Sequence, residues 1–225
     1  MRRLSCILLF LSLLAVHAQE EWRTVLASMP LRTNVTELNT SNYVNTMLGA
    51  FQSNDTVKAL VFMPGAVDTF FWHRETTVRL TNTSPTLLDA AVALTNQTRI
   101  CATFRPPWLL LHFDWDPLEP LAQIKEPATV EKIRAKRFPA HVIFNDRDWD
   151  YLLPTLKKST GVTVGPKLHS RYSYHFYRSS FAAWNLNAWE GLELVSLASK
   201  TTFTVEKRKV TFKEDLRDPS AGSGP

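Results

Sequence analysis

Three alternating side chains in the segment HFDWDP have the types and spacing that could hold a divalent metal ion: His112, Asp114 and Asp116. On an extended chain every second side chain points to the same side, so one imidazole and two carboxylates would face the same ion. A working metal site also needs further ligands and groups that orient them, and the sequence marks none. A strand end that runs into a solvated acidic loop explains the segment more simply. A metal-dependent hydrolase that uses these three residues remains the alternative function.

No other part of the sequence carries a catalytic pattern. The other histidines lack paired ligand spacing, and the chain has no G-x-S-x-G, no phosphate-binding loop and no glycine-rich dinucleotide turn. With only 7 glycines in 225 residues, loops that wrap closely around a phosphate are disfavoured. We therefore expect a protein that is not an enzyme and that holds no cofactor and no metal.

A cluster of aromatic and basic residues is the best candidate for a binding surface. The segment HSRYSYHFYR, residues 169–178, lies a few residues before Trp184. Tyrosine, tryptophan and arginine are enriched where proteins contact one another, because they combine apolar area with hydrogen-bonding groups. The predicted binding residues are Arg171, Tyr172, Tyr174, Tyr177, Arg178 and Trp184. The alternative is that this cluster covers an interface between two parts of the chain.

The segment NLNAWEGLELVSLASKTTFTVEKRKVTFK predicts a capped helix followed by a β-hairpin. Asn187 is a good N-cap, and Glu190 three residues later completes a capping box. Apolar residues at helical spacing follow, from Trp189 to Leu197. Two β-rich runs then flank a polar turn at residues 206–209.

An earlier segment, TNTSPTLLDAAVALTNQTRICATFRPPWLLLHF, has the same order of elements. Ser84 is its expected N-cap, and the expected inward face is Leu88, Ala91, Val92 and Thr95. Upstream, SNYVNTMLGAFQSNDTVKALVF and DWDYLLPTLKKSTGVTV each predict a helix and a strand, with a glycine ending the second helix. The sequence therefore predicts an α+β fold of two small repeated units, each with two helices packed on a short mixed sheet.

These motifs resemble the short domain at the N-terminus of secretins and TonB-dependent transducers. The second half supplies LLPTLKKSTGVTV and AWEGLELVSLASKTTFTVEKRKVTF, and the first half supplies VNTMLGAFQSNDTVKALV and LLDAAVALTNQTRICATF. The resemblance covers residues 30–113 and 138–213. It implies a small α+β domain that works in the periplasm by protein–protein contact, with no catalytic residues to transfer. This sequence differs from the family pattern because the domain is doubled.

The N-terminal stretch MRRLSCILLFLSLLAVHAQ has the three parts of an export signal. Arg2 and Arg3 precede an apolar run, and Val16-His17-Ala18 offers small residues at the cleavage positions. The run is shorter than the ~20 residues that span a bilayer, so we expect export to the periplasm or the medium and no transmembrane anchor. Two of the five net positive charges lie in this leader, and the remainder is too small to predict a nucleic-acid partner.

Cysteines and glycosylation sequons point to different sources. Only Cys101 follows the leader, so the mature chain cannot form an internal disulfide, which favours a bacterial periplasmic protein. In a eukaryote, the first half would instead be glycosylated at its N-x-Ser/Thr sequons. These sequons begin at Asn34, Asn39, Asn54, Asn82 and Asn96.

The composition of the segments gives the expected organisation. A signal peptide covers 1–18, a first unit 24–113, a proline-bearing linker 114–137, a second unit 138–213 and a flexible tail 214–225. The expected function is that of an exported, non-catalytic protein-interaction module of the cell envelope. Its partner is expected to be another envelope protein.

Overall fold

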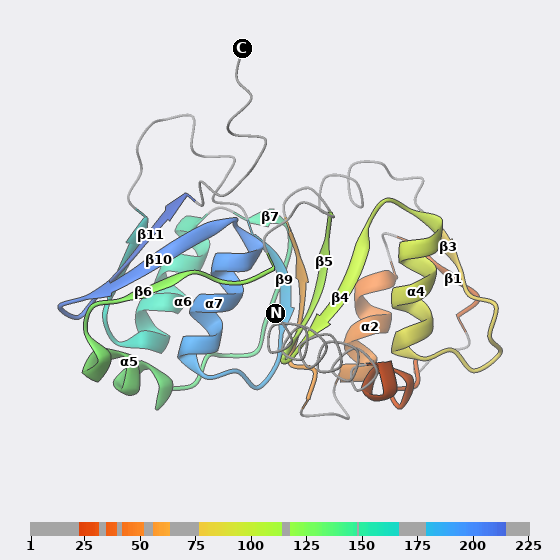
Figure 1. Cartoon of the computed structure of the whole chain (residues 1–225), viewed down its shortest axis with the longest axis horizontal. Coiled ribbons are helices and arrows are strands. Elements are labelled where there is room, and N and C mark those ends of the chain that lie inside the picture. Colours follow the sequence, from red (N-terminus) through yellow and green to blue (C-terminus); the bar gives the residue numbers. More distant parts are fainter. Residues whose placement is uncertain are drawn as a thin grey trace, which may run out of the picture.

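The computed structural model describes residues 23–31, 35–39, 42–51, 56–63, 77–113, 118–147, 149–166 and 179–214. Helices are interspersed with single strands and runs of strands, and the larger sheets are mixed, so the fold is α+β as the sequence predicts. Figure 1 shows sheets and helices side by side across the long axis of the molecule, with α4 near one end and β11 near the other.

The described elements of the first half precede residue 114. They are β1 (Glu37–Leu38), α2 (Tyr43–Phe51), β2 (Ala59–Phe62), β3 (Val78–Arg79), α4 (Leu87–Gln97), β4 (Cys101–Arg105) and β5 (Trp108–His112). The described elements of the second half follow residue 117. They are β6 (Ala122–Ile124), α5 (Pro127–Arg134), β7 (His141–Arg147), α6 (Trp149–Thr160), β8 (Thr163–Pro166), β9 (Ser179–Ala183), α7 (Ala188–Ala198), β10 (Thr201–Glu206) and β11 (Lys209–Glu214).

One sheet contains strands from both halves. Its order is β4-β5-β2-β9-β7, with β2 parallel to β5 and antiparallel to β9. In the register, Ala59 of the first half lies between Trp108 and Ala183. A second sheet has the order β6-β10-β11-β8, and β1 and β3 form a separate pair. The pairing of β2 with β9 therefore joins the two halves through backbone hydrogen bonds.

The two halves share an order of elements. Each has a helix, a strand, a capped helix and a hairpin, which are α2-β2-α4-β4-β5 in the first half and α6-β8-α7-β10-β11 in the second. In each half the last strand of the hairpin pairs in parallel with the earlier strand, β5 with β2 and β11 with β8. This order agrees with the pattern on which the repeat was predicted; that the two halves are copies of one unit stays a prediction.

The five-stranded sheet separates two cores because its side chains alternate between its faces. Leu60, Phe62, Leu109 and Leu111 belong to a core that also contains buried residues of α2 and α4. Their neighbours on the other face belong to a core that contains α7 and the inner face of the second sheet. These neighbours are Ala59, Val61, Trp108 and Leu110. Each face of the sheet is therefore covered by helices from a different half.

Helix α7 lies between the two sheets. It contacts β2 and β9 of the five-stranded sheet and β10 of the four-stranded sheet. From Leu194 to Ser199 every side chain is buried, and Trp189 and Leu192 are buried as well. A helix that is apolar on all sides is typical of a position with protein around it. The predicted cap is confirmed, because the Asn187 side chain accepts a hydrogen bond from the Glu190 backbone at 2.9 Å.

The start of α4 differs from the prediction. Its N-cap is Thr86, whose hydroxyl accepts from the Asp89 backbone while the Asp89 carboxylate accepts from the Thr86 backbone, so Ser84 is not the cap. Two cap candidates were present, and this reciprocal pair decides between them. The inward face shifts accordingly. It consists of Leu87, Ala90, Ala91 and Leu94, and Val92, predicted to be inside, is 42% exposed.

Residues with a left-handed backbone conformation lie at two places where the sequence predicts that an element ends. Gly161, with φ of 67°, follows α6, and Lys207 and Arg208, with φ of 45° and 63°, form the β10–β11 turn. Two successive positive φ values match the right-handed twist of a hairpin. The predicted inward residues Leu152 and Leu156 of α6 are fully buried.

The segment expected to be a linker, 114–137, contributes packed elements in its described part. Strand β6 pairs in parallel with β10, and Val130 and Ile133 of α5 are buried in the core that contains α7. Apolar residues at helical spacing within the segment make this possible, because they give α5 an inward face. The boundaries between the predicted units stay a prediction.

Replacing Gly191 of α7 should destabilise the fold. A Cβ built at this position lies 2.5 Å from Cδ2 and 2.7 Å from Cγ of Phe138, closer than packed atoms approach. Gly191→Ala is expected to lower the free energy of unfolding by about 1–3 kcal/mol, because overpacking exceeds the gain in helix propensity. Chemical denaturation measures this change in the free energy of unfolding.

Gly165→Ala is the matched control, because a Cβ there meets nothing within 4 Å. Its stability is expected to stay within about 0.5 kcal/mol of the original. Adding Phe138→Leu to Gly191→Ala should restore part of the loss. A Gly191→Ala protein as stable as Gly165→Ala would contradict the close contact.

Candidate functional site

The junction between the two halves holds the one predicted binding residue that the structure describes, Trp184. This tryptophan directly follows β9, and it is 46% exposed. Its backbone N–H donates to the Lys58 carbonyl at 2.7 Å, so the end of β9 is tied to the start of β2. An apolar ring of this size in water is unfavourable unless a partner covers it.

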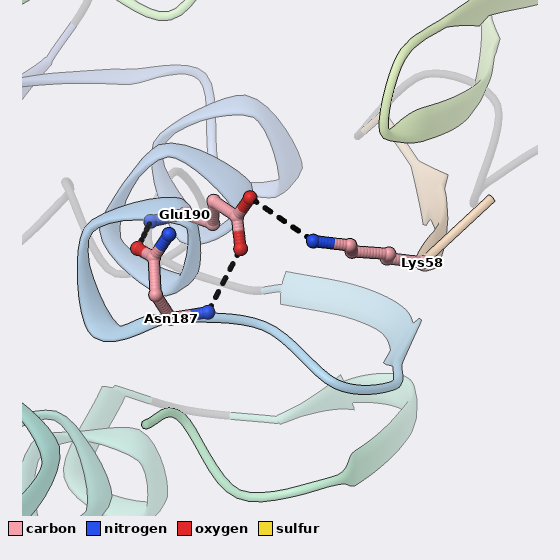
Figure 2. Close-up of polar contacts among 3 residues, drawn as sticks. All are labelled: Lys58, Asn187 and Glu190. Carbon is pink, nitrogen blue, oxygen red and sulfur yellow. Dashed lines mark hydrogen bonds and ion pairs between the residues drawn. The ribbon is translucent and has the colours of Figure 1, made fainter. Parts of the chain in front are cut away.

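Lys58 connects the first half to the cap of α7 (Figure 2). Its ammonium lies 3.4 Å from Oε1 of Glu190, while Oε2 of the same carboxylate accepts from the Asn187 backbone at 2.8 Å. The side chains of Lys58 and Glu190 are 27% and 19% exposed, so the pair is only partly screened by water. One carboxylate thus completes the capping box of α7 and binds a cation from the other half.

The same end of the five-stranded sheet carries further backbone ties. The backbone N–H groups of Lys58 and Ala59 donate to the Pro107 carbonyl at 2.9 and 3.3 Å. Arg105, which is paired in register with Trp108, forms an ion pair with Glu119 at 2.5 Å. The register places Arg105 and the residue before Trp184 at the same end of this sheet. An exposed tryptophan and partly exposed cations therefore lie at this end of the sheet, an arrangement common in protein–protein contact surfaces.

A second polar group lies on α7 one turn further on. The Trp189 indole N–H donates to the Glu193 carboxylate at 2.7 Å, and the Arg134 guanidinium lies 5.5 Å from the centre of the Trp189 ring. Burial raises the pKa of the Glu193 carboxyl above its ordinary value, and the charge of Glu190 acts in the same direction. The hydrogen bond from Trp189 and the charge of Arg134 oppose this shift.

His112 is held within the β4–β5 hairpin. It is 6% exposed, and its ring nitrogens lie 2.8 Å from the Thr103 hydroxyl and 2.7 Å from the Phe113 carbonyl. Because both nitrogens have hydrogen-bond partners in the protein, neither is turned toward an open position. Asp114 and Asp116 lie outside the described residues. Among the residues that are described, no three His, Cys, Asp or Glu side chains gather as metal ligands would.

The remaining predicted binding residues lie outside the described part of the chain, in 167–178. They are Arg171, Tyr172, Tyr174, Tyr177 and Arg178. Sequence reasoning identified Glu190 as a capping residue and missed its contact with Lys58. The two residues are 132 positions apart, and no local spacing rule connects them. The signal that was present, a lysine immediately before a buried strand, is too common to be specific.

In the comparisons with known proteins, no family model, no curated protein and no solved structure matches this chain. Within the described residues, none of the helices is both long and apolar enough to cross a bilayer.

Replacing Glu193 tests the buried carboxyl. A carboxyl whose pKa is raised in the folded state favours folding fully only below its unfolded pKa of about 4.3, and this contribution is lost as the pH rises through the folded pKa. The free energy of unfolding of the original protein minus that of Glu193→Gln should therefore fall as the pH rises from about 4 and then level off. Denaturation curves at several pH values measure this difference.

Glu131→Gln removes an exposed carboxylate from the neighbouring α5 and serves as the control for the loss of one charge. A difference between the original protein and Glu193→Gln that increases with pH over the same range would show that burial does not dominate at this site.

Proposed function

We propose that the chain is an exported, non-catalytic protein-interaction module of the cell envelope, and that its partner contacts the end of the five-stranded sheet around Trp184. The observation that carries the proposal is the exposure of Trp184. At 46% it is the most exposed of the aromatic residues whose side chains the structure describes, and the others among these are buried or half-buried. The N-terminal leader supports export, and the resemblance to the N-terminal short domain of secretins and TonB-dependent transducers supports a role in protein contact.

The support for a protein partner comes from the residue types at this end of the five-stranded sheet. Tryptophan and arginine dominate the energetics of protein interfaces when a partner removes them from water. Here Trp184 directly follows the end of β9, with Lys58 and Arg105 at the same end of the sheet. The backbone hydrogen bonds of Lys58 with Pro107 and Trp184 hold this end of the sheet in place before binding, which limits the entropy lost on association.

A photo-crosslinking amino acid at position 184 tests the proposal in intact cells of the natural source. We expect a discrete crosslinked product from position 184, because the side chain would lie inside the interface. The same amino acid at Val92, which is 42% exposed on α4, is the matched control and should give no such product. N-terminal sequencing of the same material is expected to begin at Gln19.

Substitution should then separate binding from folding. Trp184→Ser is expected to lower the affinity for the crosslinked partner by at least about tenfold, since interface tryptophans often contribute more than 2 kcal/mol. The melting temperature should change little because the ring is half exposed. Identical crosslinking from positions 184 and 92, or binding that survives Trp184→Ser, would contradict the proposed surface.

A further inference from the structure

Three elements of the second half bring basic side chains together at one end of the molecule. The Lys136 ammonium, just after α5, lies directly over Gly161 and leaves no room there for a Cβ. Gly161 ends α6, and its N–H donates to the Lys157 carbonyl at 2.9 Å. Two residues later, the N–H of Thr163 donates to the carbonyl of Arg208 in the β10–β11 turn at 3.1 Å. Figure 1 shows α5, α6 and this turn at the same end.

We call six exposed cations in and beside these elements the basic end: Lys136, Lys157, Lys158, Lys207, Arg208 and Lys209. Glu206, the carboxylate beside the β10–β11 turn, forms an ion pair with Lys125 at 3.2 Å, so its charge is balanced by that lysine. Glu126, before α5, is partly buried, and the exposed carboxylate of Glu131 on α5 is paired with Arg134 at 3.1 Å. Positive charge therefore predominates on this surface. Clustered cations raise the local potential enough to attract an anionic surface from within about a Debye length, roughly 8 Å in physiological salt.

An aliphatic side chain is exposed beside these cations. Ile124 ends β6 and is paired in register with Val205, two residues before the β10–β11 turn. Its side chain is 46% exposed although its strand partner is fully buried. The next residue, Lys125, donates its backbone N–H to the Val205 carbonyl at 3.1 Å. The exposed isoleucine thus borders the basic end and is held in place by the sheet.

We propose that the basic end docks on the surface of an anionic lipid membrane, with the cations against the headgroups and Ile124 inserted between them. An apolar side chain surrounded by lysine and arginine is the composition that membrane-surface segments use, because charge attracts the protein and apolar burial retains it. This inference is independent of the proposed protein partner, whose surface lies at the junction of the two halves.

A soluble polyanion fits these observations less well. Nucleic acids and acidic glycans would also be attracted by the cations, but they would gain little from an aliphatic side chain. The described aromatic ring that could stack on a base or sugar, Trp184, lies at the junction instead. The contribution of Ile124 therefore distinguishes a membrane from a dissolved polymer.

The test measures binding of the full chain to phosphatidylcholine vesicles with and without about 30 mol% phosphatidylglycerol, by co-sedimentation at low and high salt. The charge-removal variant is Lys157→Gln, Lys158→Gln, Lys207→Asn and Arg208→Gly. Asn-Gly is the preferred pair for a two-residue turn with positive φ at both positions, so the hairpin should stay intact. The control for charge loss elsewhere is Arg79→Gln with Arg99→Gln, which removes two exposed cations from the first half.

The original protein should bind anionic vesicles more tightly than neutral ones, and high salt should weaken binding. Removing the four charges should weaken it at least about 100-fold, because each cation near an anionic surface contributes close to a fivefold change. The first-half control should bind like the original. Equal binding to both vesicles, or equal losses in the two variants, would overturn the proposal.

Ile124→Ser provides the second readout. It should weaken binding to the anionic vesicles by about 5–10-fold, since the partly exposed side chain would lose its apolar burial. Retention on a heparin column should stay unchanged, and the melting temperature should show that the variant is folded. Vesicle binding that is indifferent to Ile124, or heparin binding without vesicle binding, would replace the membrane with a soluble polyanion.

Discussion

The burial of α7 between two sheets is the constraint on which the rest of the structure depends. On one side the helix covers the face of β2 and β9 that carries Ala59, Val61, Phe181 and Ala183, and on the other it covers the four-stranded sheet. Its capping-box carboxylate, Glu190, also binds Lys58 of the first half. The first half would expose a row of apolar side chains without α7, so the stability of each half depends on the other.

The sequence was informative where local chemistry decides the structure. The capping box at Asn187 and Glu190, the turn at Lys207 and Arg208 and the glycine after α6 each have a short-range physical cause, and each is found as predicted. The start of α4 was predicted two residues early because Ser84 and Thr86 are both good caps. Only the reciprocal bonds with Asp89 distinguish them.

Long-range pairing could not be predicted from the sequence. The periodicity of residues 179–183 gives a strand, but it does not say that this strand lies beside β2, more than 100 residues earlier. The same holds for β6 beside β10 and for Lys58 beside Glu190. The nearly all-apolar pattern of α7 was the one available signal, because a helix with so little polar surface needs protein on all sides. Of the predicted binding cluster, the structure describes Trp184 alone, at the junction where β9 pairs with β2.

Native-state hydrogen exchange of Leu192→Ala tests the central role of α7 most directly. Leu192 is fully buried in the core that both sheets share, and its truncation should cost about 2–5 kcal/mol. If α7 joins the halves into one cooperative unit, the slowest amides of β2 and β5 should lose as much protection as those of β10 and β11. Protection that falls in β10 and β11 while β2 and β5 stay as protected as in the original chain would contradict the account.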